Sequence, residues 1–285
     1  MTLTVDRALR DARLRLTESP TAALDAELLL AHALERRRTW LRAWPEAVLP
    51  DDRRERFEAL LARREAGEPV AYLLGWREFW SLEFEVGPGV LIPRPETEAL
   101  VWCVLQTLPA PATRPLEVLD LGTGSGCIAL TLAQVRPDLR VTAVEASREA
   151  LEVARRNAAR HGMRNVTFVE GEWFGPVAGR RFDLVVSNPP YIASGDPHLR
   201  SGDVRFEPAA ALDGGPDGLD ALRAIAARAP QHLLPGGVLA VEHGHDQRDA
   251  VAALFTQAGL CDVTGYSDDS GHPRVATGRA PRLGE

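Results

Sequence analysis

The tetrapeptide Asn188-Pro-Pro-Tyr191 carries the most specific chemical signal in the chain. It follows an apolar run, 182–186, that is typical of a buried strand. The two prolines fix backbone φ angles and remove two N–H donors, while their carbonyl oxygens remain acceptors. The Asn188 side-chain oxygen and the Pro189 carbonyl can therefore accept both protons of a substrate –NH₂ group, and Tyr191 can stack over a planar group. This pattern predicts a clamp that directs a nitrogen lone pair toward an electrophile; a simple turn is the alternative interpretation.

A glycine-rich stretch, Asp120-Leu-Gly-Thr-Gly-Ser-Gly126, forms a second candidate site after the apolar run 116–121. Glycines let the backbone approach a ligand closely, and the helix start that follows supplies unpaired N–H groups. The third glycine comes one residue earlier than in the dinucleotide fingerprint, which disfavours a nicotinamide cofactor and suits a ligand without phosphates. A tight strand-to-helix turn without a ligand is the alternative. The predicted cofactor contacts in this loop are Asp120, Gly122, Thr123, Gly124, Ser125 and Gly126.

Glu145 ends the next predicted strand, about 20 residues after the glycine-rich stretch, where an acidic residue can accept both ribose hydroxyls of an adenosine-containing cofactor. A charge at the helix N-terminus ahead of Arg148 is the alternative. For Asp120 we expect either a role in orienting the loop or a contact with an ammonium group of the cofactor.

Strands and helices alternate from residue 116 onward. Strands are predicted at 116–121, 140–145, 165–170, 182–187 and 237–243, and helices at 126–135, 148–161, 218–233 and 247–258. The segments 263–267 and 275–278 are expected to pair as an antiparallel hairpin at the sheet edge. This order predicts an α/β fold with a doubly wound parallel sheet. Because ligands bind outside the carboxyl ends of such strands, both motifs belong at one edge.

The first part of the chain, 1–75, is predicted to be a small all-helical domain. The second helix is expected to start at Ser19-Pro20, with Leu24, Leu28, Ala31 and Leu34 as its apolar stripe. A third helix is expected from Pro50 to Gly67. It carries five arginines that indicate either a solvated face or a partner-docking surface: Arg53, Arg54, Arg56, Arg63 and Arg64.

A β-hairpin linker is predicted over 76–95, before a catalytic domain over 96–285. Leu82, Phe84 and Val86 alternate with polar residues, 87–89 is expected to form the turn and 90–92 the returning strand. A helix is expected after Pro93-Arg-Pro-Glu-Thr97, and a loop at 109–115. The long Gly- and Pro-rich stretch 193–218 is of a length that is usually functional or disordered.

Composition narrows the classes of function. The 285 residues carry a net charge of −7, which argues against an extended nucleic-acid-binding surface, and all 33 basic residues are Arg. Three well-separated cysteines predict neither a disulfide framework nor a zinc site and fit a reducing cytosol. His243 and His245 fall on one face of a strand without a third ligand nearby, so we expect a structural role and no metal. No signal peptide or membrane span is evident, which predicts a cytoplasmic protein.

Several motifs together resemble one family. The glycine-rich stretch resembles the S-adenosylmethionine loop of class I methyltransferases, and Asn188-Pro-Pro-Tyr191 resembles the catalytic motif of amino-methyltransferases. The chain as a whole resembles the HemK/PrmC family, whose members methylate the side-chain amide (N5) of the glutamine in the Gly-Gly-Gln motif of class I peptide-chain release factors. Further stretches carry this resemblance: Gly75-Trp-Arg-Glu-Phe-Trp80, Leu91-Ile-Pro-Arg-Pro-Glu-Thr97, Val204-Arg-Phe-Glu-Pro208 and Glu242-His-Gly244.

The resemblance implies a Rossmann-like fold, S-adenosylmethionine as cofactor with S-adenosylhomocysteine as product, and release factors as partners. It implies a cofactor site at Gly122 to Gly126, Glu145, Trp173 and Asn188, and a substrate site at Asn188, Pro189, Pro190 and Tyr191. Trp173 follows the third predicted strand, where an aromatic ring can lie against adenine; a core aromatic is the alternative. The family commonly has Asp where this chain has Glu145, and the longer side chain shifts the geometry at the ribose. Arg94 and Glu96 are expected to shape the substrate entrance.

Two other functions use the same features. An exocyclic amine on a DNA or RNA base is also a planar –NH₂, but a flipped base needs a pocket and phosphate-binding residues, and the net charge of −7 disfavours it. A cofactor-regulated binding module without catalysis is the third hypothesis, and the intact Asn188-Pro-Pro-Tyr191 argues against it. We therefore expect no direct nucleic-acid or membrane partner.

Overall fold

The computed structural model describes residues 3–109 and 114–282. The chain divides into two compact units. The first unit runs to Trp76 and includes Ser201–Phe206, and the second contains Arg77–Arg200 and the chain from Glu207 onward. A short segment from the middle of the chain therefore folds with the N-terminal helices.

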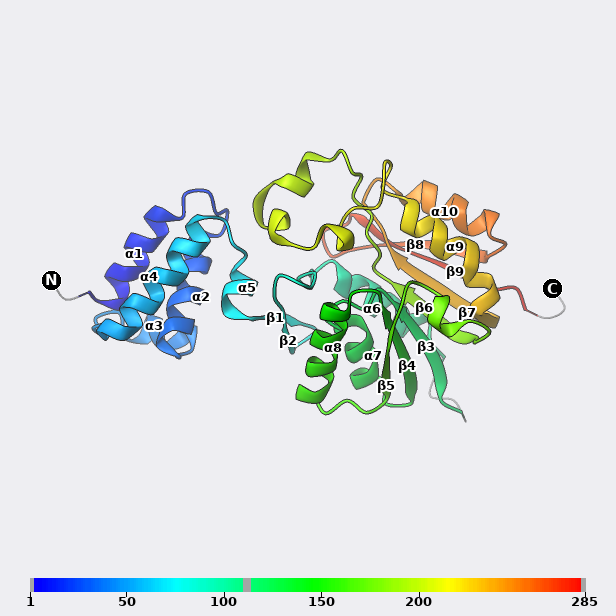
Figure 1. Ribbon diagram of the computed structural model, residues 1–285, viewed down its shortest axis with the longest axis horizontal. Helices are drawn as coiled ribbons and strands as arrows, with labels where there is room; N and C mark the ends of the chain where they lie inside the picture. The colour runs from blue at the N-terminus through cyan, green and yellow to red at the C-terminus, as the bar shows by residue number, and fades with distance from the viewer. Residues whose placement is uncertain (1–2, 110–113, 283–285) are drawn as a thin grey trace. The chain divides into compact units, whose positions relative to one another are not determined.

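The first unit is helical throughout (Figure 1). Its helices are α1 (Val5–Arg15), α2 (Ala22–Leu34), α3 (Arg38–Ala43), α4 (Asp51–Glu65) and α5 (Val70–Leu74). Their apolar faces enclose one core that includes Leu29, Leu41 and Phe57. The third predicted helix is present as α4, whereas the short α3 and α5 carry too few turns to show a periodic pattern.

The predicted start of α2 is wrong. The helix begins at Ala22, with Thr21 as the preceding residue. Ser19 instead donates its hydroxyl proton to Asp25 Oδ2 at 2.7 Å and accepts from the Thr21 N–H at 3.1 Å. Leu24, expected in the apolar stripe, is 40% exposed. The buried face contains Asp25, Ala26, Leu29, Leu30, Ala31 and Ala33.

Arg64 also differs from the expected solvated helix face. Its side chain is buried, with Nε 2.8 Å from Asp25 Oδ2 and Nη1 2.6 Å from Asp203 Oδ1. Arg205 Nη2 in turn donates to the Ala66 carbonyl at 2.8 Å. These bonds hold Ser201–Phe206 in the first unit, although the segment lies far away in sequence.

The hairpin lies earlier in the chain than predicted, because the segment expected as its first strand is its second strand. β1 (Trp76–Phe79) and β2 (Leu82–Glu85) form a two-stranded sheet. Its turn is Trp80–Ser81, with φ of 50° and 61°, the left-handed pair that a tight two-residue hairpin loop requires. The expected turn at 87–89 and strand at 90–92 are therefore wrong, although Leu82 and Phe84 are buried as their alternation predicted.

The second unit is built on a seven-stranded mixed sheet with the order β5-β4-β3-β6-β7-β9-β8. Its strands are β3 (Leu116–Leu121), β4 (Leu139–Glu145), β5 (Val166–Glu170), β6 (Phe182–Ser187), β7 (Leu233–Glu242), β8 (Cys261–Ser267) and β9 (Pro273–Arg279). The first five are parallel, and β9 runs antiparallel between β7 and β8. The structure confirms the predicted sheet and its antiparallel edge.

Helices cover both faces of this sheet (Figure 1). One face carries α6 (Thr97–Thr107), α7 (Cys127–Val135) and α8 (Arg148–Arg160), and the other carries α9 (Asp220–His232) and α10 (Arg248–Gln257). Alternate strand residues supply the two cores, with Val118 on the first face and Leu119 on the second. The doubly wound architecture is therefore confirmed.

The long stretch 193–218 contains three short 3₁₀ helices, at Pro197–Arg200, Gly202–Phe206 and Ala209–Ala211. Of the loop expected at 109–115, residues 110–113 lie outside the described residues. Among the described helices, none is long and apolar enough to cross a membrane.

Candidate functional site

The glycine-rich stretch and Asn188 lie side by side at the carboxyl edge of the sheet. β3 pairs with β6 so that Leu121 faces Ser187, and with β4 so that Leu121 also faces Val144. The Ser187 hydroxyl donates to the Leu121 carbonyl at 2.7 Å, which ties the two strand ends together. The strand order reverses between β3 and β6, because β4 and β5 lie on one side of this pair and β7 on the other. Doubly wound sheets bind ligands at such a switch point.

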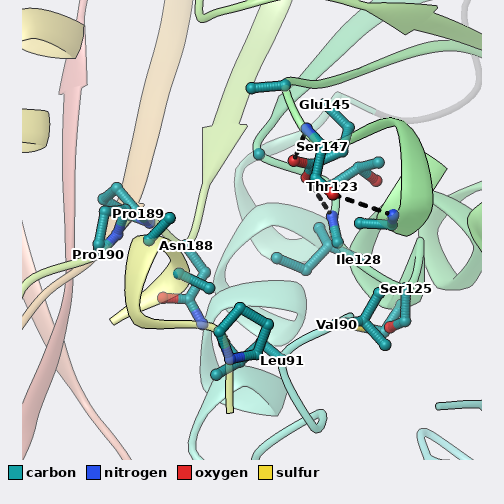
Figure 2. A pocket seen from close by; sticks show the side chains of 18 of the residues that line it. Val90, Leu91, Thr123, Ser125, Ile128, Glu145, Ser147, Asn188, Pro189 and Pro190 are labelled. Atoms are coloured by element: carbon teal, nitrogen blue, oxygen red, sulfur yellow. Dashed lines mark hydrogen bonds between the residues drawn. The ribbon is translucent and has the colours of Figure 1, made fainter. Parts of the chain in front are cut away.

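A cavity of about 430 Å³ opens at this edge, within the size range of small-molecule sites. Figure 2 shows Asn188, Pro189 and Pro190 across it from Glu145 and Thr123. The predicted site residues that line it are Gly122, Thr123, Gly124, Ser125, Glu145, Trp173, Asn188, Pro189 and Pro190. Asp120, Gly126 and Tyr191 are not among the lining residues, so the structure places them behind the cavity wall.

Two glycines of the loop have separate roles. Gly124 has a φ of 56°, and a Cβ added to it would meet no atom within 4 Å, because the position opens into the cavity. Gly126 has a φ of 85°, and its Cβ would lie 3.1 Å from Leu130 and 3.3 Å from Ala154. Gly124 therefore leaves room for a ligand, whereas Gly126 allows α7 and α8 to pack closely.

Glu145 is held by the backbone around it (Figure 2). Its Oε2 accepts from the Gly124 N–H at 2.9 Å, and its Oε1 accepts from the Ser147 N–H at 2.9 Å. Each carboxylate oxygen keeps a second lone pair, so the side chain can still accept from two hydroxyl groups. These two bonds determine where the longer Glu side chain places its oxygens.

Asp120 supports the loop from below. It is fully buried and accepts from the Thr123 hydroxyl at 2.6 Å. Burial raises the pKa of the Asp120 carboxyl to about 7, against the lowering effect of the Thr123 hydrogen bond. This contact favours the loop-orienting role over a direct contact with a ligand.

Trp173 forms one wall of the cavity after β5. Its ring lies 3.9 Å from the position of a Cβ on Gly122. The residue has a φ of 48°, a left-handed backbone that is costly for a non-glycine residue and occurs preferentially at functional sites. The flat face of an indole beside a glycine loop suits a planar ligand ring.

The Asn188 amide is fixed in one direction. Its Nδ2 donates to Thr97 Oγ1 at 3.0 Å. Across the residues that the structure describes, no hydrogen bond occupies the Asn188 Oδ1 or the Pro189 carbonyl. Both oxygens are therefore free to accept a hydrogen bond, and both residues line the cavity.

Sequence comparisons address the family of the chain. Profiles of the PrmC N-terminal domain and of the methyltransferase small domain match residues 7–75 and 100–211. The release factor glutamine methyltransferase of Xylella fastidiosa is 52% identical over 90% of this chain and 93% of its own. That of Pseudomonas aeruginosa is 50% identical, over 97% of this chain and 98% of its own. The chain belongs to the release factor glutamine methyltransferase family.

The fold of this family member is shared with other methyltransferases. A methyltransferase from Pyrococcus furiosus superposes with a TM-score of 0.55 at 22% identity, covering 79% of this chain and 98% of its own. At that identity the likeness concerns the fold alone. The family resemblance inferred from the sequence motifs is confirmed by the identity to the two release factor glutamine methyltransferases.

The methyltransferase holds the backbone after Asn188 with bonds that the motifs did not reveal. The Ile192 N–H donates to the Leu212 carbonyl at 3.0 Å, and the Gly214 N–H donates to the Ile192 carbonyl at 2.8 Å. Gln247 Nε2 donates to the Tyr191 carbonyl at 2.9 Å. The long stretch 193–218 thus supports the tetrapeptide.

Tyr191 is anchored behind the cavity. Its hydroxyl donates to Glu242 Oε1 at 3.0 Å, and burial raises the pKa of the phenol. This position does not support the stacking contact expected for its ring. Tyr191 instead connects the tetrapeptide to the end of β7.

Three further supporting residues were not predicted individually. Glu207 accepts from the Ile92 N–H at 2.9 Å and from the Arg94 guanidinium, and so holds the Pro-rich segment at the cavity. Asn157 Nδ2 donates to the Ser125 carbonyl at 2.9 Å. Thr97 and Glu207 stand inside motifs that carried the resemblance, and Asn157 is a polar residue on the apolar face of an amphipathic helix.

His243 and His245 have different surroundings. His243 is fully buried, with Nδ1 2.8 Å from the Gly244 carbonyl, and burial lowers the pKa of its imidazole. His245 is exposed near His272. In the described part of the chain, no group of three or more His, Cys, Asp or Glu side chains could hold a metal ion.

Proposed function

We propose that this protein methylates the N5 nitrogen of the glutamine in the Gly-Gly-Gln motif of class I peptide-chain release factors, with S-adenosylmethionine as donor and S-adenosylhomocysteine as product. One observation carries the proposal. Asn188 and Pro189 both line the cavity, and Thr97 holds the Asn188 amide nitrogen, which leaves the Asn188 Oδ1 free to accept. Two neighbouring acceptors suit the two N–H protons of a primary amide. The assignment of the release factor rests on the family.

The cavity suits the cofactor. The Glu145 carboxylate can accept the ribose hydroxyls, the loop from Gly122 to Gly126 leaves space at Gly124, and Trp173 offers a ring for adenine. S-adenosylmethionine, when bound, supplies an electrophilic methyl group. The N–H groups of the loop and the buried Asp120 position these contacts.

The tetrapeptide can help the substrate amide nitrogen to act as the nucleophile. An amide nitrogen is a poor nucleophile because its lone pair is delocalised into the carbonyl. Asn188 Oδ1 and the Pro189 carbonyl each accept one N–H bond, and these bonds strengthen as positive charge develops on nitrogen. They also hold the nitrogen in place, which lowers the entropic cost of reaching the transition state. No general base is needed before transfer, since the proton becomes acidic only afterward.

The proposal also assigns roles to three parts of the chain, which are residues 1–75, the linker 76–95 and residues 96–285. We assign recognition of the protein substrate to 1–75, and methyl transfer to the remainder. This is supported by the cavity, whose lining residues all belong to the second unit, and by the separate domain profile that matches 7–75. A release factor as substrate would place the protein in the cytoplasm.

Mass spectrometry of a purified release factor, after incubation with the protein and S-adenosylmethionine, tests the proposal. We expect a mass gain of one methyl on the Gly-Gly-Gln glutamine, and no gain in a factor whose glutamine is replaced by alanine. A DNA or RNA oligonucleotide in parallel serves as the competing substrate. Methylation of the oligonucleotide alone, or cofactor binding without any methyl transfer, would reject the proposal.

A further inference from the structure

Two buried polar residues bond to the tetrapeptide, and neither is a reacting group in the chemistry described above. Glu242 is the last residue of β7 and is 1% exposed, and Thr97 is the first residue of α6 and is 3% exposed. The Tyr191 hydroxyl donates to Glu242 Oε1 at 3.0 Å, and Asn188 Nδ2 donates to Thr97 Oγ1 at 3.0 Å. Burying a carboxyl group is unfavourable unless it is well bonded, so its presence here calls for a role.

The orientation of the Asn188 amide decides whether the tetrapeptide can bind a substrate –NH₂. A side-chain amide presents an acceptor on one end and two donors on the other. Only the oxygen end can accept from a primary amide, because the –NH₂ end would meet the substrate donor to donor. The bond to Thr97 Oγ1 selects the productive orientation.

The Thr97 hydroxyl can accept this bond only while its own proton points elsewhere. Glu242 is the neighbouring acceptor. In the described chain, its Oε2 is buried without a partner within the usual hydrogen-bond distance. Among the groups that lower the pKa of this carboxyl, the Thr97 hydroxyl has the largest effect, ahead of Tyr191 and Arg274. With its proton directed toward this carboxyl, the Thr97 hydroxyl keeps its lone pairs for Asn188.

We propose that Glu242 and Thr97 are positioning residues, which set the Asn188 amide with its oxygen toward the substrate. This inference rests on the proposed function, since it explains how the clamp for the glutamine amide is kept in register. Glu242 also accepts the bond from Tyr191, at the other end of the tetrapeptide. Neither Glu242 nor Thr97 is required to touch the methyl group.

Thr97→Val and Thr97→Ser form the decisive pair. Valine has nearly the shape of threonine but lacks the hydroxyl, whereas serine keeps it. In single turnovers at saturating cofactor and release factor, we expect Thr97→Val to slow methyl transfer about 10- to 100-fold, the range for a misplaced catalytic group. Thr97→Ser should stay within a few-fold of the parent. Affinity for S-adenosylmethionine should be similar in all three proteins.

A double-mutant cycle shows whether Thr97 acts through Asn188. If it does, Thr97→Val should cost little in an Asn188→Ala background, because the amide it orients is already absent. Glu242→Gln should behave like Thr97→Val, because it replaces one carboxyl oxygen by an –NH₂ group, which donates toward Thr97 when the remaining oxygen accepts from Tyr191. A full rate for Thr97→Val, or losses that multiply independently with Asn188→Ala, would overturn the proposal.

A readout independent of activity separates this inference from the proposed function. Hydrogen exchange of the Asn188 side-chain –NH₂, followed by NMR and identified by its absence in Asn188→Ala, should be faster in Thr97→Val than in the parent or Thr97→Ser. Unchanged exchange would overturn the inference even in an active enzyme. A parent that methylates no release factor would reject the proposed function but leave this exchange test in force.

Discussion

Asn188 Nδ2 lies 3.0 Å from Thr97 Oγ1, a bond between residues 91 positions apart in sequence. It joins the loop after β6 to the first residue of α6. The tetrapeptide is thus bonded to a helix that precedes the whole parallel sheet in the chain. Several predictions about the site and the fold rest on contacts of this kind.

Replacing Asn188 by Ala removes one of the two acceptors proposed for the substrate amide. Loss of a hydrogen bond that stabilises developing charge is typically worth ~2.7–4 kcal/mol, or ~100- to 1000-fold in rate. We expect a loss of that order in the methyl-transfer step, measured as a single-turnover rate at saturating cofactor and substrate. Because Asn188 also lines the cavity, cofactor affinity must be measured separately. A folded Asn188→Ala protein within a few-fold of the parent rate would show that this clamp is not the source of catalysis.

Gly124→Val should abolish binding of S-adenosylmethionine, because its side chain would project into the cavity. Gly162→Val is a matched control. Gly162 also has a left-handed φ, 66°, and open space around its Cβ, but it does not line the cavity. Calorimetry should show lost affinity for Gly124→Val alone, with a similar loss of stability in both variants. Equal affinity in the two variants would reject the placement of the cofactor.

Arg64→Met should destabilise the first unit. Its guanidinium and Asp25 are both buried, so removal of Arg64 leaves a carboxylate without its partner, which typically costs ~3–5 kcal/mol. Arg63→Met is the control, because Arg63 pairs with Glu68 at the surface, where a pair contributes ~0–1 kcal/mol. Chemical denaturation of both variants measures the difference. Equal losses would mean that the buried pair does not stabilise this unit.

Glu242 should make stability depend on pH. Burial raises the pKa of its carboxyl from 4.5 to about 7, against the opposing effects of Thr97, Tyr191 and Arg274 and with a smaller rise from Glu96. Between these values the folded protein keeps a proton that the unfolded chain has released, so this group lowers the free energy of unfolding as pH rises and adds no further loss above about 7.

Glu242→Gln removes this pH dependence. Relative to the parent, the free energy of unfolding of the variant should rise across the window by up to roughly 3 kcal/mol, at about 1.4 kcal/mol per pKa unit. Glu78→Gln, at an exposed site, is the control. Denaturation curves at pH values from 4 to 8 test it, and parallel curves for Glu242→Gln and the parent would contradict a raised pKa.

Trp44→Ala should weaken recognition of the intact release factor if 1–75 binds it. Trp44 is 60% exposed in the first unit, and exposed tryptophans are frequent anchors of protein interfaces. We expect kcat/KM for the intact factor to fall about 10-fold or more, with no change for a short Gly-Gly-Gln peptide. Trp102, 52% exposed in the second unit, provides the control substitution. A loss for Trp102→Ala alone would move recognition to the catalytic unit.

Local patterns in the sequence were sufficient for much of the fold. β3 and β6 have the predicted limits, because short, mainly apolar runs bounded by turn residues are typical of buried strands. The hairpin was misplaced because Gly87 and Gly89 are strong turn residues, whereas the actual turn uses Trp80 and Ser81 with left-handed backbones. The predicted start of α2 was wrong because the Ser19 side chain, which was expected to cap the helix, bonds to Asp25 instead.

The sequence by itself determined the residue types of the candidate site and the edge of the sheet where they meet. Glycine spacing, proline geometry and the alternation of strands and helices are local patterns along the chain. Only the tertiary structure decided which distant residues bond to one another: Asn188 to Thr97, Tyr191 to Glu242, and Arg64 to Asp203. Each of these bonds joins residues at least 50 positions apart, and such pairs form only when packing of the apolar cores brings distant elements together. Side-chain orientation at the site therefore depends on the folded core. The local sequence pattern specifies only which residues must be oriented.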